Sequence, residues 1–289
     1  MTIYRSLEGK EQILKLYDQD WAAMGLETES AFISTRYGKT HVIISGPRDA
    51  EPIVVFHGGN MISPISFAWL IPLVKRYRIY APDTVGHPGY SAETRLKPAT
   101  FQYGEWATDV IDGLGLEKPV VLGGSYGAGI LLNLAAYAPQ KIGKAILVVP
   151  SGFAPPPMLP LIAKIGIPMI MYQFTHKRDW LVRSLIPMCP QPSDDIVEIT
   201  GAVYRHLLLE AEMPRSIQAE DLKDFQAPTL VLAAENDVLF PPTAVIRRAR
   251  EVIKNLVAAE IIAGSAHFVP PALQPALCER IDRFIQQGK

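Results

Sequence analysis

Residues 120–129 read VVLGGSYGAG and have the pattern of a strand that enters a helix through a glycine turn. Within them, GGSYG fits Gly-x-Ser-x-Gly, a motif that presents a serine at a strained strand-to-helix turn. Gly123 and Gly127 stand where side chains must be small, because the strand and helix backbones approach each other there. The residues that follow, AGILLNLAAYAP, carry apolar side chains at helical spacing. The stretch therefore predicts a nucleophile elbow centred on Ser125.

The composition indicates a globular protein with a small-molecule substrate. A chain of 289 residues, 48% of them hydrophobic, can bury a large core as one domain with an insertion. Its 28 basic and 29 acidic side chains give no broad field that would attract nucleic acid. Cys189 and Cys278 have neither metal-ligand nor disulfide-scaffold spacing, so we expect two buried thiols. The first residues lack the apolar stretch of a signal peptide, which predicts a cytoplasmic protein; the sequence leaves the oligomeric state open.

Strand and helix patterns alternate along most of the chain. Strand-like segments are expected at residues 31–36, 40–45, 53–56, 77–81, 145–149, 229–234 and 260–263, and in the apolar run that begins at Val120 and leads into the elbow. Helical periodicity is expected at residues 10–24, 67–75, 103–114, 128–139, 245–253 and 277–285. The alternation predicts an α/β sheet that is mostly parallel after an initial hairpin, with helices on both faces. Residues 1–151 and 223–289 would form this core.

Residues 152–222 interrupt the alternation. An apolar run reaches Phe174 but is broken by Pro160, Lys164 and Pro168, so we expect a helical cap and no membrane span. Apolar cap residues would line the substrate pocket, and the candidates are Met158, Leu159, Met169 and Met171. The basic residues that follow are interpreted as a solvated face: His176, Lys177, Arg178 and Arg183.

Three residues that can form a catalytic triad follow three different predicted strands. Ser125, Asp237 and His267 occur in the order nucleophile, acid, base, and the carboxyl ends of parallel strands converge on one crevice. A serine hydroxyl needs an imidazole to take its proton, and the imidazole needs a carboxylate to fix its tautomer. Glu235 lies two residues before Asp237, so it stays open whether Glu235 shares the acid role. Asp83 precedes the serine in the chain and is interpreted as structural.

A glycine-containing segment after the predicted strand 53–56 is a candidate oxyanion hole. It reads HGGN at residues 57–60, and glycines let backbone N–H groups approach a developing oxyanion. Gly59 is the first candidate donor, and Asn60 is a neighbour that can share the role. The second donor would be the N–H of Tyr126, directly after the serine. We expect His57 to brace the loop.

With these motifs together, the chain resembles the α/β-hydrolase superfamily over essentially its whole length. The resemblance rests on HGGN at 57–60, DTVGHPGYS at 83–91, GGSYG at 123–127, ENDVLFPP at 235–242 and GSAHF at 264–268. It implies an eight-stranded, mostly parallel sheet, a helical cap between the strands ending at Val149 and starting near Thr229, and no cofactor. Two departures are Pro88, where the family commonly has a small residue, and Asn60, which replaces a third glycine.

The resemblance extends to the smaller capped members, whose relatives include carboxylesterases, lactonases and carbon–carbon bond hydrolases. The first hypothesis is a serine hydrolase of a small, largely apolar ester, thioester, lactone or amide that acts through an acyl-enzyme. Hydrolysis of a carbon–carbon bond, or acyl transfer to an acceptor other than water, would use the same triad. A ligand-binding receptor on a hydrolase fold is a further alternative. Serine at the elbow centre argues against the dehalogenase and epoxide-hydrolase branches, which have aspartate there.

Overall fold

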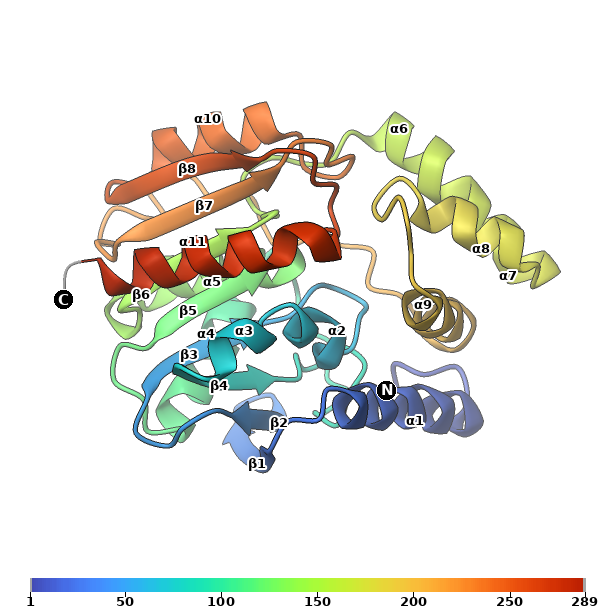
Figure 1. Cartoon of the computed structure of the whole chain (residues 1–289), viewed down its shortest axis with the longest axis horizontal. Coiled ribbons are helices and arrows are strands. Elements are labelled where there is room, and N and C mark those ends of the chain that lie inside the picture. The colour runs from blue at the N-terminus through green and yellow to red at the C-terminus, as the bar shows by residue number, and fades with distance from the viewer. Residues whose placement is uncertain (1, 288–289) are drawn as a thin grey trace.

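The computed structural model describes residues 2–287, and an eight-stranded sheet forms its centre (Figure 1). The strands are β1 (Thr28–Thr35), β2 (Gly38–Ser45), β3 (Glu51–Phe56), β4 (Tyr77–Pro82), β5 (Val120–Gly124), β6 (Lys144–Val148), β7 (Thr229–Ala234) and β8 (Leu256–Ile262). Their order is β1-β2-β4-β3-β5-β6-β7-β8. The pairs β1–β2 and β2–β4 are antiparallel, and all remaining pairs are parallel. The predicted hairpin and the mostly parallel sheet are thus confirmed.

Successive side chains of the central strands point to opposite faces of the sheet, as the period of two requires. On β3, Ile53 and Val55 belong to one buried cluster, while Val54 and Phe56 belong to a second cluster. Every residue of β7 is buried, whereas the edge strands β1 and β8 keep several exposed positions. Both faces of the central sheet are therefore covered, which explains why its strands read as continuous apolar runs.

Helices cover these two faces. The first cluster includes residues of α2 (Ser63–Ala68), α3 (Ile71–Val74) and α11 (Gln274–Gln286). The second includes residues of α4 (Gln102–Gly113), α5 (Tyr126–Tyr137) and α10 (Pro242–Val252). The single helix expected at residues 67–75 is instead the pair α2 and α3. Pro72 lies in the first turn of α3, where its missing N–H is tolerated, and cannot continue α2.

The N-terminal helix α1 (Leu7–Ala23) begins at a Ser6 N-cap, whose side chain accepts a hydrogen bond from the Gly9 N–H at 3.0 Å. The sequence periodicity predicted a helix here, over residues 10–24. In the structure it packs against α2 and also against α9 (Asp194–His206) of the inserted segment. It therefore connects the sheet region to the insertion.

The chain between β6 and β7 contains α6 (Met158–Leu161), a π-helical segment (Ile162–Gly166), α7 (Ile167–Thr175), α8 (Arg178–Leu185) and α9. Figure 1 shows these helices beside the sheet, on the side to which the parallel strands point. The stretch Met158–Thr175 is long and apolar enough, by length and composition alone, to cross a membrane, and 17% of it is buried. Cys278 is buried as expected, whereas Cys189 in this segment is half-buried.

Candidate active site

Ser125 lies at the sharp turn between β5 and α5. Its φ of 53° and ψ of −116° are strained for a residue with a side chain, as a nucleophile elbow requires. A Cβ on Gly123 would come within 2.4 Å of the Gly127 oxygen, and one on Gly127 within 2.0 Å of the Phe56 oxygen. The two glycines thus permit the close approach of strand and helix that the sequence predicted. The Ser125 N–H donates to the Val148 oxygen at 3.0 Å and fixes the turn to β6.

The side chains of Ser125, His267 and Asp237 form one hydrogen-bonded chain. His267 Nε2 lies 2.9 Å from Ser125 Oγ, and His267 Nδ1 lies 2.9 Å from Asp237 Oδ2. Both Asp237 and His267 are buried. The other carboxylate oxygen, Asp237 Oδ1, accepts the N–H groups of Leu239 at 2.8 Å and Phe240 at 3.1 Å. Asp237 therefore holds its own turn and orients the imidazole at the same time.

The loops that carry Asp237 and His267 are tied to each other. The Asn236 N–H donates to the Ser265 oxygen at 2.8 Å. Glu235 accepts the Gly264 N–H at 2.8 Å. These two bonds hold the ends of β7 and β8 in register beyond the sheet. Glu235 is exposed, and its carboxylate binds a backbone N–H of the histidine loop, while the carboxylate of Asp237 contacts the imidazole itself.

Asp83 lies in a different network. It is fully buried, and its Oδ2 lies 2.9 Å from His41 Nδ1. Tyr17 and Ser63 donate their hydroxyls to Oδ1 at 3.1 and 2.6 Å. The Tyr90 N–H donates to Oδ2 at 2.9 Å. Asp83 thus connects α1, β2 and α2, as the structural interpretation expects.

The segment after β3 is braced by two buried histidines. His57 donates from Nδ1 to the Gly58 oxygen at 2.8 Å and accepts the Thr84 N–H on Nε2 at 2.9 Å. His87 Nδ1 accepts the Asn60 N–H at 3.1 Å, and its Nε2 lies 3.3 Å from Tyr103 Oη. Burial lowers the pKa of His57 and, together with the nearby charge of Arg95, lowers that of His87 well below its usual range. Both imidazoles are therefore neutral.

His87 is a site residue that the sequence interpretation missed. Its position in the loop after β4 gave no sign that it reaches the segment after β3. The Asn60 side chain is also engaged, since it exchanges two hydrogen bonds with the backbone of Glu210, at 2.7 and 2.8 Å. Asn60 thus connects the site to residues beyond α9, and its own N–H is already donated to His87.

The N–H groups of Gly59 and Tyr126 differ from that of Asn60. Within residues 2–287, neither donates a hydrogen bond to another protein group. Tyr126 is buried, and an unpaired backbone N–H in a buried residue is rare. A Cβ on Gly59 would lie 2.9 Å from the Tyr126 ring, so glycine lets the two backbones come close. The Tyr126 hydroxyl donates to Tyr103 at 3.0 Å, which anchors its ring.

The four cap residues expected to line the pocket are placed unequally. Met158 is 58% exposed and Leu159 is 81% exposed. Met169 is partly buried and packs against the first core cluster, and Met171 is half-buried. The pocket role of all four stays a prediction, and the burial of Met169 and Met171 suits it better.

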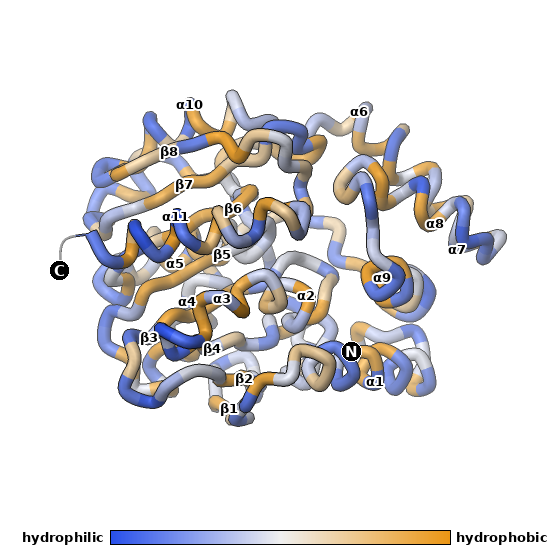
Figure 2. The backbone as a smooth tube through the Cα atoms, viewed as in Figure 1, coloured by the Kyte–Doolittle hydropathy of each residue, from blue (hydrophilic) through white to orange (hydrophobic). Residues whose placement is uncertain are grey.

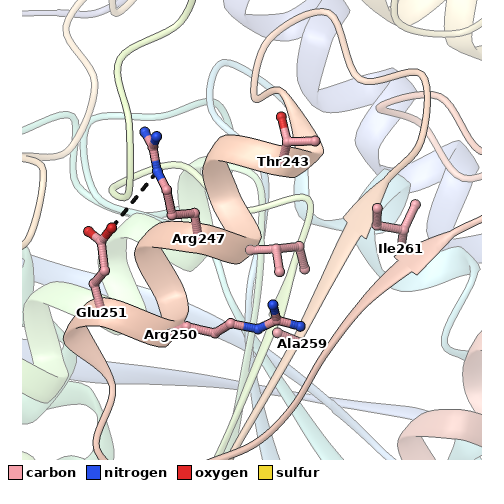
Figure 3. Close-up of a pocket in the computed structure, with 7 residues that line it drawn as sticks. Thr243, Arg247, Arg250, Glu251, Ala259 and Ile261 are labelled. Carbon is pink, nitrogen blue, oxygen red and sulfur yellow. Dashed lines mark ion pairs between the residues drawn. The ribbon is translucent and has the colours of Figure 1, made fainter.

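A hollow of about 570 Å³ lies between α10 and the edge strand β8 (Figure 3). Thr243, Ile246, Arg247, Arg250, Glu251, Ala259 and Ile261 line it. Figure 3 shows Arg247 and Glu251 joined as an ion pair, at 3.9 Å, along one turn of α10. None of the lining residues belongs to the loops that carry Ser125, Asp237 or His267.

Among residues 2–287, no three His, Cys, Asp or Glu side chains gather as metal ligands would.

Comparison with known proteins gives relatives that match this architecture. The family model of the alpha/beta hydrolase fold matches residues 51–174. Carboxylesterase YbfK of Bacillus subtilis (strain 168) is 25% identical, over 99% of this chain and 97% of its own. The carboxylesterase nap of the same strain is 26% identical, over 93% and 90% of the two chains.

The fold likeness extends to solved structures. The crystal structure of naproxen esterase (carboxylesterase NP) from Bacillus subtilis superposes with a TM-score of 0.82 at 23% sequence identity. The superposition covers 98% of this chain and 100% of that chain. The family match includes β3, the elbow and β6, and the structural match extends over the remainder of the sheet. The chain has the α/β-hydrolase fold.

Proposed function

We propose that this protein is a serine hydrolase that cleaves a small, largely apolar carboxylic ester through an acyl-enzyme. The observation that carries the proposal is the hydrogen-bonded chain from Ser125 through His267 to Asp237, with Ser125 at a strained elbow. Relatives that align over nearly the whole chain carry the name carboxylesterase, which favours an ester among the possible acyl substrates. Residues 152–222 are taken as the cap over this site, and the cytoplasmic location stays a prediction.

The first half of the reaction acylates Ser125. Its Oγ attacks the ester carbonyl while His267 Nε2 takes the hydroxyl proton. Asp237 stabilises the imidazolium across the 2.9 Å contact to Nδ1. The tetrahedral intermediate then collapses, the C–O bond to the alcohol breaks, and His267 returns the proton to the leaving alkoxide. Water attacks the acyl-enzyme by the same route and releases the acid and the free serine.

The negative charge on the carbonyl oxygen needs donors that are in place before the reaction. We assign the N–H groups of Gly59 and Tyr126, because no protein acceptor within residues 2–287 uses them. Asn60 is the weaker candidate, since its N–H is donated to His87. The neutral His87 would hold the segment after β3 at a fixed distance from the elbow.

The acyl group would lie against the apolar side of the cap, with Met169 and Met171 as the first lining residues to test. An apolar lining excludes water and favours an uncharged chain. Each methylene buried there adds about 0.8 kcal/mol of binding, which is about fourfold. The same triad can serve thioester, lactone or amide hydrolysis, carbon–carbon cleavage or acyl transfer, and these stay alternatives for the test.

The test is kcat/KM for nitrophenyl esters of increasing acyl length, measured beside lactones and thioesters. We expect kcat/KM to rise over the first few carbons and to fall once the pocket is full. Met169→Ala and Met171→Ala should move the optimum, while Leu7→Ala on the exposed end of α1 should leave it in place. A preference for acetyl or charged acyl groups, or no ester turnover by protein whose Ser125 still reacts with an acylating probe, would contradict the proposal.

A further inference from the structure

The helix formed by α6, the π-helical segment and α7 exposes one apolar side. Of the 18 residues Met158–Thr175, only 17% are buried. Six large apolar side chains of this helix are about half exposed or more, and we call them the outer stripe: Met158, Leu159, Ile162, Ile167, Ile170 and Phe174. Figure 2 shows apolar colouring along much of this helix. A patch of this extent marks an interaction surface.

The π-helical segment keeps the stripe on one side. From Leu159 to Phe174 the stripe residues are spaced by three or four, except for the step of five from Ile162 to Ile167. That step spans the π turn, in which the Ile167 N–H donates to the Ile162 oxygen. Pro168 follows directly and has no N–H to donate to the Lys164 oxygen, so the wider turn also accommodates the proline.

The opposite side of the helix is fixed to the cap. Ile165, Pro168 and Tyr172 are buried, and the Tyr172 hydroxyl lies 3.5 Å from the Gly201 oxygen of α9. α7 also packs against α8. At 1.5 Å per residue the helix is about 27 Å long, and crossing a membrane would require these contacts to break. The geometry therefore suits a helix that lies along an apolar surface.

Exposed basic residues accompany the stripe in the chain. Lys164 is the one charged residue within Met158–Thr175, and His176, Lys177 and Arg178 follow at the turn into α8. We call Lys164 and residues 176–178 the basic border. Acidic residues offset part of this positive charge: Arg178 forms an ion pair with Asp194, and Asp179 lies in the first turn of α8. Apolar side chains bordered by Lys and Arg are typical of helices that lie in the membrane interface.

We propose that the outer stripe and the basic border dock this protein on the surface of an anionic lipid bilayer, with α6–α7 parallel to the surface. A bilayer supplies both an apolar layer for the stripe and negative headgroups for the basic border. A second copy of the chain would supply the apolar contact but bring an identical basic border. Docking does not depend on ester hydrolysis.

Flotation with vesicles tests this inference on the full-length chain. We expect binding to phosphatidylcholine vesicles containing one-third phosphatidylglycerol to exceed binding to pure phosphatidylcholine at least tenfold, and to weaken as salt is raised. Ile170→Glu and Phe174→Glu should each reduce binding at least tenfold. Lys164→Gln and Lys177→Gln should each reduce it about fivefold, and only on the anionic vesicles.

Leu7→Glu is the matched control, because Leu7 is 73% exposed and lies on α1. Circular dichroism and melting temperature should be unchanged in all five variants. Three results would overturn the proposal: absence of native binding to the anionic vesicles, native-like binding by both stripe variants, or equal loss by Leu7→Glu. A dimer in light scattering that Phe174→Glu dissociates, without vesicle binding, would assign the stripe to a second copy instead.

Discussion

Within residues 2–287, two serine–histidine–aspartate chains occur, and their hydrogen-bond distances are nearly the same. In one, His267 lies 2.9 Å from both Ser125 and Asp237. In the other, His41 Nε2 lies 2.8 Å from Ser30 Oγ and its Nδ1 lies 2.9 Å from Asp83 Oδ2. Hydrogen-bond distances alone therefore do not distinguish a nucleophile from a structural network.

The surroundings of the two serines differ. Ser125 occupies a strained turn beside two unused backbone N–H groups, whereas Ser30 lies within β1, paired with Ile43 of β2. His41 is also enclosed by aromatic rings, with Phe32 at 5.0 Å and Tyr90 at 5.4 Å between ring centroids. We infer that a hydrogen-bonded histidine and aspartate are not enough to make a serine reactive. A strained elbow and backbone N–H donors for the oxyanion are also needed.

The largest expected effect separates the two serines. Ser125→Ala should lower kcat on a nitrophenyl ester by about 10⁶-fold, because the acyl-enzyme can no longer form. Ser30→Ala should leave kcat unchanged. Steady-state kinetics of both purified variants, with folding checked by circular dichroism, measures the difference, and a large loss in Ser30→Ala would invalidate the distinction.

Replacing Asp237 should impair catalysis, whereas replacing Asp83 should impair stability. Asp237→Asn should lower kcat about 10⁴-fold with little change in stability, because it favours the wrong histidine tautomer. Asp83→Asn should instead lower the free energy of unfolding by ~2 kcal/mol, since charged hydrogen bonds become neutral. Its folded fraction should keep its kcat. Glu235→Gln serves as the control for the acid, and damage equal to that of Asp237→Asn would reopen the assignment.

Replacing a proposed oxyanion donor should have an intermediate effect on kcat. Gly59→Pro removes one N–H and should lower kcat by at least about 10²-fold. Gly59→Ala is the matched variant, because it adds the same Cβ against the Tyr126 ring and keeps the donor. The loss in Gly59→Pro should therefore exceed that in Gly59→Ala. Equal rates for the two variants would remove Gly59 from the oxyanion hole.

The smallest effect concerns the histidines that brace the loops near Ser125. His57 and His87 have lowered pKa values in the folded protein, so they bind protons there at a lower pH than in the unfolded chain, where they bind protons below about pH 6.5. The free energy of unfolding should thus fall as the pH drops from 7 to 5, by up to ~1.4 kcal/mol per pH unit for each histidine.

Urea unfolding across this pH range measures the slope. Burial raises the pKa of Asp20 to about 6, so Asp20 acts in the opposite sense and is best replaced by asparagine in every sample. In that background, His87→Gln should make the slope shallower. A slope that His87→Gln leaves unchanged would show that this imidazole is not the buried neutral group assigned here.

Local sequence patterns predicted the sheet and the elbow because both depend on neighbours in the chain. The apolar runs of β3 and β7 and the glycines at 123 and 127 are signals of this kind. The contact between His87 and Asn60 depends on how two loops meet, which spacing does not encode. The sequence also did not predict that the outer stripe of α6–α7 is exposed, because periodicity indicates an apolar face but not what covers it.

The central claim is that Ser125 alone of these two serines is a nucleophile. The most direct measurement is labelling of the native protein with a fluorophosphonate, followed by peptide mass mapping. The account predicts one label per chain, on Ser125, and none in the Ser125→Ala variant. A label on Ser30, or labelling that persists in Ser125→Ala, would contradict it.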